Sequence, residues 1–194
     1  MTRIILASGS PRRRELLESL KIAFEVRVSH VEEVLGPHEA PDAYVRRLSI
    51  EKGESVARLE PDALVIAADT TVYVDGTILE KPSDVADAER MLGAIAGKTH
   101  TVFTGLTLLR DSAGIKLTEV ERTEVTMSAM TAEEIAWYAA TREPLDKAGA
   151  YAIQGIGAAF VELVNGSYTN VVGLPLPLLR RMLLRAGESV LGGA

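Results

Sequence analysis

The feature that most constrains the fold is a continuous apolar run, ALVIAA at residues 63–68, which ends directly at a carboxylate, Asp69. A strand without polar alternation has no solvent face, so it must be covered on both sides. The stretch RIILAS at residues 3–8 has the same β-branched, apolar character and is followed by turn residues. Two buried strands of this kind indicate the α/β class.

The rest of the chain combines helical periodicity with hairpin signals. We expect helices over 11–20, 41–59, 84–96, 132–140 and 175–186. A capping box of Thr131 and Glu134 opens the fourth of them. We expect further strands at 100–109, 115–127 and 158–164, and a hairpin turn at Asp75-Gly76. Because hairpins accompany the buried strands, we predict a mixed, twisted sheet flanked by helices in one domain, 1–194.

Composition excludes several classes of function. There is no cysteine, which rules out disulfides and thiolate metal sites and agrees with a reducing compartment. The net charge of −6 argues against broad nucleic-acid binding. The first ten residues carry too short an apolar stretch for a signal peptide, and no run approaches membrane-spanning length. We therefore expect no nucleic-acid or membrane partner, and any anionic ligand must be held by a local basic cluster.

Three arginines, Arg12 to Arg14, stand where a helix should begin, in the stretch LASGSPRRRELL at residues 6–17. Ser10 is a good N-cap and Pro11 a good first helical residue. Arg12 and Arg13 then face the positive end of the helix dipole, at a cost of about 0.3–1 kcal/mol each. An anion bound at that end would turn both into ligands. The alternative is a solvated basic turn, and Arg14 is expected to point to solvent.

Lys52 and Asp69 also break local rules. Lys52 falls inside an apolar helical stripe, where it either reaches to the rim or enters a cleft beside the core. Asp69 follows the buried run, where a carboxylate must be paired, hydrogen-bonded or bound to a cation. It would suit Mg²⁺ binding or proton abstraction from water, and the alternative is a structural cap of the turn.

Two further polar residues are candidates. Lys81 follows the hairpin and precedes a proline. Gln154 lies in DKAGAYAIQGIG, residues 146–157, which is rich in small residues of the kind that line ligands. Its amide can donate to and accept from a base edge, or merely satisfy nearby backbone. Four cations with one acid fit a polyphosphate with Mg²⁺, and so predict a phosphate-ester or nucleotide site without fixing the reaction.

Six ordered segments resemble the Maf family of nucleoside triphosphate pyrophosphatases, over about residues 4–178. They are LASGSPRRRELL, YVRRLSIEK, AADTTVYVDGTILEKP, GKTHTVFTGL, EPLDKAGAYAIQG and NGSYTNVVGLPL. The resemblance implies two lobes around a deep cleft, with an architecture similar to inosine triphosphate pyrophosphatases. It also implies cleavage between the α- and β-phosphates to the monophosphate and pyrophosphate, a divalent cation (Mg²⁺ or Mn²⁺), a cytoplasmic location and a homodimer.

The resemblance also assigns roles to residues. It implies that Ser8, Arg12 and Arg13 form the first phosphate-binding group. Glu33, Lys52 and Lys81 then line the cleft. Asp69 is the implied proton acceptor, and Asp69 with Glu33 would hold the metal.

The resemblance also implies a subtype, from three positions. Thr70 after Asp69, and Gln154 in YAIQG, together with Arg12, resemble the subtype that cleaves dTTP and UTP rather than the one that prefers 7-methyl-GTP. Modified pyrimidine nucleotides are further candidate substrates, with a role in clearing non-standard nucleotides or in cell-division arrest. Two departures from the family pattern are Ala68, where Gly is common, and Gly53, where Ala is usual. The rival functions are a non-catalytic regulator and a phosphomonoesterase that releases orthophosphate.

Overall fold

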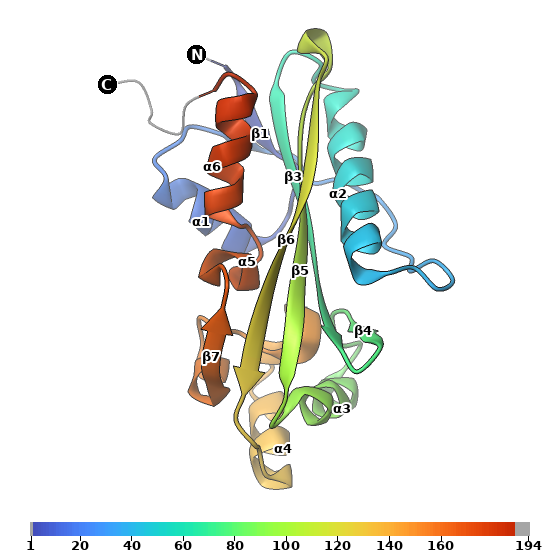
Figure 1. The fold of residues 1–194 in the computed structure, drawn as a ribbon, viewed down its shortest axis with the longest axis vertical. Coiled ribbons are helices and arrows are strands. Elements are labelled where there is room, and N and C mark those ends of the chain that lie inside the picture. The colour runs from blue at the N-terminus through green and yellow to red at the C-terminus, as the bar shows by residue number, and fades with distance from the viewer. Residues whose placement is uncertain (1, 189–194) are drawn as a thin grey trace. The chain divides into compact units, whose positions relative to one another are not determined.

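The structure is a computed structural model that describes residues 2–188 (Figure 1). Its helices are α1 (Pro11–Ser19), α2 (Pro41–Ala57), α3 (Val85–Ile95), α4 (Ala132–Ala140), α5 (Tyr168–Val172) and α6 (Leu176–Arg185). Its strands are β1 (Ile4–Leu6), β2 (Glu25–Val26), β3 (Leu64–Val74), β4 (Thr77–Leu79), β5 (Thr99–Arg110), β6 (Ile115–Met127) and β7 (Val161–Asn165). Short 3₁₀ turns lie at Asp111–Ala113, Glu143–Asp146, Ala148–Ala150 and Ile156–Phe160.

The strands form a mixed seven-stranded sheet in the order β2-β1-β3-β5-β6-β7, with β4 paired to β3. Strand β1 runs parallel to β2 and to β3, whereas β4 is antiparallel to β3 and β7 is antiparallel to β6. The predicted mixed α/β class is therefore confirmed.

The chain divides into two compact units. Among the described residues, the first consists of residues 2–69, 104–121 and 173–188, and the second of residues 70–103 and 122–172. Strands β3, β5 and β6 contribute residues to both. Within the described residues, no helix is both long enough and apolar enough to cross a membrane.

In the first unit, β3 is buried on both faces, as the apolar run predicts. Successive strand residues point to opposite faces of a sheet. Leu64 and Ile66 pack with residues of α1 and α6, while Val65 and Ala67 pack with residues of α2. Figure 1 shows α1 and α6 on one side of β1 and β3 and α2 on the other. Val65 and Ala67 of β3 therefore face α2.

Gly53, the departure from the family pattern on α2, fits this close contact between helix and strand. A Cβ at this position would lie 2.7 Å from Leu109 Cδ1 and 3.3 Å from the Cβ of Ala67. Alanine here would require a neighbour to shift, so the absence of a side chain has a packing reason.

The second unit has a separate core. Its buried side chains come mainly from α3, α4, β4 and the parts of β3, β5 and β6 that belong to this unit, among them Val72, Leu92, Val102, Val125 and Tyr138. The capping box that opens α4 is present, with the Glu134 N–H donating to Thr131 Oγ1 and the Thr131 N–H to Glu134 Oε2. The Asp75-Gly76 turn joins β3 to β4 with positive φ at both residues, as a type I′ hairpin requires.

Several predicted boundaries were wrong. We expected a strand to end at residue 68, but β3 continues through Asp69 to Val74, because alternating β-branched residues follow and pair with β4. In the expected strand 158–164, the first residues belong to the 3₁₀ turn Ile156–Phe160, and β7 begins only at Val161. Strand β2 and helix α5 were not predicted, since elements of two and five residues have no readable periodicity.

Candidate active site

Asp69 lies on the α2 face of β3 and is buried. Its position follows from strand alternation, because it shares parity with Val65 and Ala67. Its side chain is 7% exposed and accepts a hydrogen bond from Lys52 Nζ at 2.6 Å. The requirement that a buried carboxylate be paired is therefore met by a cation from α2.

Lys52 enters the interior instead of reaching to the rim. It lies on the buried stripe of α2, and its side chain is 8% exposed. Its ammonium contacts Glu33 Oε1 at 2.7 Å as well as Asp69, and the Glu33 side chain is 42% exposed. Lys52 therefore joins a buried carboxylate to one that solvent reaches.

Burial raises the pKa of Asp69, and the nearby charge of Glu33 raises it further, while Lys52 and Arg13 oppose the shift. A carboxylate whose pKa is raised is a better proton acceptor than an ordinary aspartate. The same environment keeps two positive charges close to it. This combination is typical of catalytic acids and bases.

Arg13 is fixed in place at the start of α1. Ser10 caps the helix and accepts from the Arg13 N–H at 3.5 Å. The guanidinium donates through Nη1 to Ser8 Oγ at 3.2 Å and through Nε to the Gly173 carbonyl at 2.8 Å. Burial lowers the pKa of Arg13, and the charges of Asp69 and Glu33 counteract this. An arginine stays charged under these conditions, so Arg13 adds a positive charge near Asp69.

The neighbouring arginines differ from Arg13. Arg12 is half-buried, and its positive charge also acts on Arg13. Arg14 pairs with Glu18 at the surface, as expected of a residue that points to solvent.

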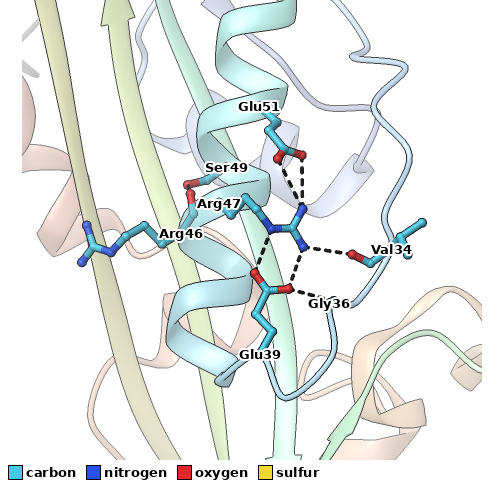
Figure 2. A network of polar contacts seen from close by, with 7 residues as sticks. All are labelled: Val34, Gly36, Glu39, Arg46, Arg47, Ser49 and Glu51. Carbon is cyan, nitrogen blue, oxygen red and sulfur yellow. Dashed lines mark hydrogen bonds and ion pairs between the residues drawn. The ribbon is translucent and has the colours of Figure 1, made fainter.

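Arg47, which sequence reasoning did not single out, holds the loop that carries Glu33 against α2 (Figure 2). Its guanidinium donates to both oxygens of Glu39, at 2.8 and 2.7 Å, and to the carbonyl of Val34 at 2.9 Å. Glu39 also accepts from the Gly36 N–H at 3.0 Å. The same guanidinium contacts Glu51, one turn further along α2. Val34 directly follows Glu33, so this network restrains the backbone next to Glu33.

Three predicted site residues belong to the second unit. Thr70 follows Asp69 in β3 and is half-buried, while Lys81 and Gln154 are exposed. Gln154 lies in a turn that precedes the 3₁₀ turn Ile156–Phe160. The roles that the sequence motifs imply for Thr70, Lys81 and Gln154 stay predictions.

His100 and Tyr151 form a buried polar pair in the second unit that the sequence did not reveal. His100 Nε2 and the Tyr151 hydroxyl are 2.8 Å apart, and the two rings meet edge to face. Burial lowers the pKa of His100 to about 4. The ring is therefore neutral near pH 7.

Two carboxylates, those of Asp69 and Glu33, are the predicted metal ligands. Among residues 2–188 no group of three or more His, Cys, Asp or Glu side chains could hold a metal ion. Asp69 and Glu33 nevertheless both contact Lys52 Nζ, so their oxygens are near one another. Mg²⁺ is commonly bound by one or two carboxylates together with substrate phosphates, and this donor set fits that pattern.

The comparisons with known proteins agree with the motifs. A "dTTP/UTP pyrophosphatase" of Bacillus cytotoxicus is 50% identical over 183 residues, covering 94% of this chain and 95% of that protein. A protein of the same name from Syntrophus aciditrophicus is 45% identical over 191 residues, covering 98% and 93%. Among solved structures, a HAM1 protein from Coxiella burnetii matches with a TM-score of 0.49 at 15% identity, over 67% of this chain and 75% of that one. The family model "Maf-like protein" matches residues 3–186, and this chain therefore belongs to the Maf family.

Proposed function

We propose that this protein hydrolyses dTTP and UTP to the nucleoside monophosphate and pyrophosphate. The observation that carries the proposal is the buried Asp69, held by Lys52 and close to the charge of Arg13, in a chain whose curated relatives are named dTTP/UTP pyrophosphatases. Modified pyrimidine triphosphates belong to the same proposed substrate class.

Positive charge is the first requirement of this reaction. Arg13 and Lys52 lie near Asp69, and Arg12 stands in the first turn of α1. Guanidinium groups match phosphate oxygens in pairs, and the start of a helix favours anions. These groups would bind the triphosphate and stabilise the charge that develops on the leaving pyrophosphate. We assign Ser8 a supporting role, since its Oγ accepts from Arg13.

Asp69 is the proposed general base. A water oxygen attacks the α-phosphorus, the bond from that phosphorus to the bridging oxygen breaks, and pyrophosphate leaves. The proton of the water passes to Asp69 and then to solvent, and the raised pKa of Asp69 favours this uptake. Lys52 holds the carboxylate in one orientation through its 2.6 Å hydrogen bond.

A divalent cation, Mg²⁺ or Mn²⁺, would be held by Asp69 and Glu33 together with phosphate oxygens. When bound, it supplies Lewis-acid stabilisation of phosphoryl charge. Glu33 is suited to this role because it is more exposed than Asp69 and contacts the same lysine.

The remaining assignments rest on the sequence motifs. We propose that Thr70, Lys81 and Gln154 complete the substrate contacts, with the Gln154 amide meeting the pyrimidine edge. We also propose a cytoplasmic location and a homodimer. Sedimentation or light scattering would test the homodimer.

The direct test is product analysis with dTTP and UTP in the presence of Mg²⁺ or Mn²⁺. We expect pyrophosphate release that stops on addition of a chelator, and a loss of about a hundredfold to ten-thousandfold in kcat for Asp69→Asn, with nucleotide binding retained. Asp62→Asn, in the exposed turn before β3, is the matched control and should keep full activity.

The alternatives give different results. Release of orthophosphate would support a phosphomonoesterase, and binding without turnover would support a regulator. Full activity of Asp69→Asn would reject the assignment of the base.

A further inference from the structure

A tyrosine and a glutamate of the second unit hold the turn that carries Gln154. Tyr138, near the end of α4, donates its hydroxyl hydrogen to Glu143 Oε1 at 2.7 Å. The same hydroxyl oxygen accepts from the Ala152 N–H at 3.0 Å. Tyr138 is fully buried, so its bond with Ala152 lies away from solvent, whereas Glu143 is half-buried. We call these two residues the Tyr138–Glu143 clasp.

The carboxylate of Glu143 binds the other end of the same turn. Its Oε2 accepts from the Ile156 N–H at 3.0 Å and its Oε1 from the Gly157 N–H at 3.1 Å. The clasp therefore holds the backbone at Ala152, two residues before Gln154, and at Ile156 and Gly157, two and three residues after it. The Gln154 side chain is left exposed at the middle of the turn.

The glycines that follow Gln154 are explained by this clasp. A Cβ at Gly155 would collide with the carboxylate of Glu143, and one at Gly157 with the hydroxyl of Tyr138. A third glycine of the segment, Gly149, has a positive φ and would place a Cβ 2.7 Å from Val72 Cγ2. The small residues of the segment thus permit close internal packing, and at positions 155 and 157 the contact they permit is the clasp.

The charge state of Glu143 suits a permanent contact. Burial by itself would raise the pKa of Glu143, but hydrogen bonds from Ile156, Tyr138 and Gly157 hold it below its ordinary value. Glu143 is therefore ionised near pH 7, and an ionised carboxylate makes the stronger hydrogen bonds.

We propose that Tyr138 and Glu143 are positioning residues that set base selectivity by fixing the turn that presents Gln154. This rests on the proposed function, in which Gln154 meets the base. Uracil and thymine offer an acceptor at C4 and a donor at N3, whereas cytosine offers a donor at C4 and an acceptor at N3. Discrimination between the bases requires the amide to be held at one distance and angle from the base edge, because an amide on a mobile turn can withdraw from a mismatched donor or acceptor instead of leaving it unpaired.

The test measures kcat/KM for UTP and for CTP in wild type, Tyr138→Phe and Glu143→Gln. Each substitution removes or weakens hydrogen bonds with little change in volume. The exposed Tyr168→Phe and Glu162→Gln, in the same unit, are the matched controls. The ratio of the two kcat/KM values does not depend on the folded fraction, so a general loss of stability leaves it unchanged.

We expect the UTP-to-CTP ratio to fall by about tenfold or more in either clasp variant and to stay constant in the controls. In a Gln154→Ala background, the clasp substitutions should have no further effect on the ratio, because they act through Gln154. Amide hydrogen exchange at Ala152, Ile156 and Gly157 should accelerate in the clasp variants, and this readout does not require turnover.

Three results would overturn the proposal. They are a wild type that does not discriminate UTP from CTP, clasp variants that keep the wild-type ratio, and a change in ratio that persists without the Gln154 side chain. If the wild type releases no pyrophosphate, the proposed function fails separately. The ratio of dissociation constants for UTP and CTP then replaces the kinetic ratio, and a wild type that binds neither nucleotide also overturns the proposal.

Discussion

Replacing Lys52 by methionine tests the buried ion pair at the centre of the candidate site. Methionine keeps the apolar stem of the side chain and removes the ammonium. The buried Asp69 then loses its hydrogen-bond donor at 2.6 Å. Removing one partner of a buried ion pair costs about 3–5 kcal/mol, because the other charge stays buried. The charge of Arg13 still acts on Asp69, and Asp69 can take up a proton. We therefore expect a loss of unfolding free energy at the lower end of this range, about 3 kcal/mol at pH 7.

Urea unfolding measures this cost. With an m-value of about 2–3 kcal/mol/M, the urea concentration at the unfolding midpoint should fall by roughly 1 M.

The loss of unfolding free energy in Lys52→Met should also shrink as the pH falls. Without Lys52 the pKa of folded Asp69 rises further above its value in the unfolded chain. The folded variant then binds a proton before the unfolded chain does, so it gains stability relative to wild type, by at most about 1.4 kcal/mol per pH unit.

The double variant Lys52→Met/Asp69→Asn is the control, since it removes both charges. Its free energy of unfolding should exceed that of Lys52→Met at pH 7. The difference in unfolding free energy between the two variants should diminish on acidification. A loss below about 1 kcal/mol for Lys52→Met, with no pH dependence, would refute the argument that Asp69 and Lys52 form a strongly coupled buried pair.

Two further perturbations test other parts of the structure. Arg47→Met should cost about 1 kcal/mol and accelerate amide exchange at Gly36 about fivefold, because Glu39 loses its bidentate partner and the loop before α2 loses a tether. Arg46→Met, its exposed neighbour on α2, should leave that exchange unchanged, and equal exchange in both variants would contradict the role of Arg47. The pKa of His100 in the folded protein is about 4, below the ordinary 6.5 of the unfolded chain. This pKa difference corresponds to roughly 3 kcal/mol of unfolding free energy that is present above pH 6.5 and is lost as the pH falls to 4. His100→Phe should flatten that part of the stability profile, and an unchanged slope between pH 4 and 6.5 would show that His100 is not the group responsible.

Local patterns in the sequence were enough for much of the fold. The apolar run at 63–68 required a strand covered on both faces, and β3 is such a strand. The caps at Ser10 and Thr131 and the turn at Asp75-Gly76 are short-range features, and all three occur where they were predicted. The stripe that contains Lys52 also placed this lysine on the buried side of α2.

Longer-range features were not readable in the same way. Asp69 was interpreted as the end of a strand, because a carboxylate after an apolar run resembles a turn; the pairing of the following residues with β4 keeps the strand going. The clasp of Tyr138 and Glu143 was hidden, because its backbone partners lie well along the chain. The only signal was the pair of glycines at 155 and 157, which were interpreted as lining a ligand.

The sequence by itself determined which apolar run forms a buried strand, where helices are capped and turns form, and to which family the chain belongs, since each of these depends on neighbours in the chain or on ordered motifs. Only the tertiary structure decided that Lys52 lies between Asp69 and Glu33, and that Glu143 binds the turn around Gln154. The physical reason is that a buried charge is stabilised by whichever groups the packed faces bring within hydrogen-bonding distance, and the identity of those groups depends on how distant segments meet.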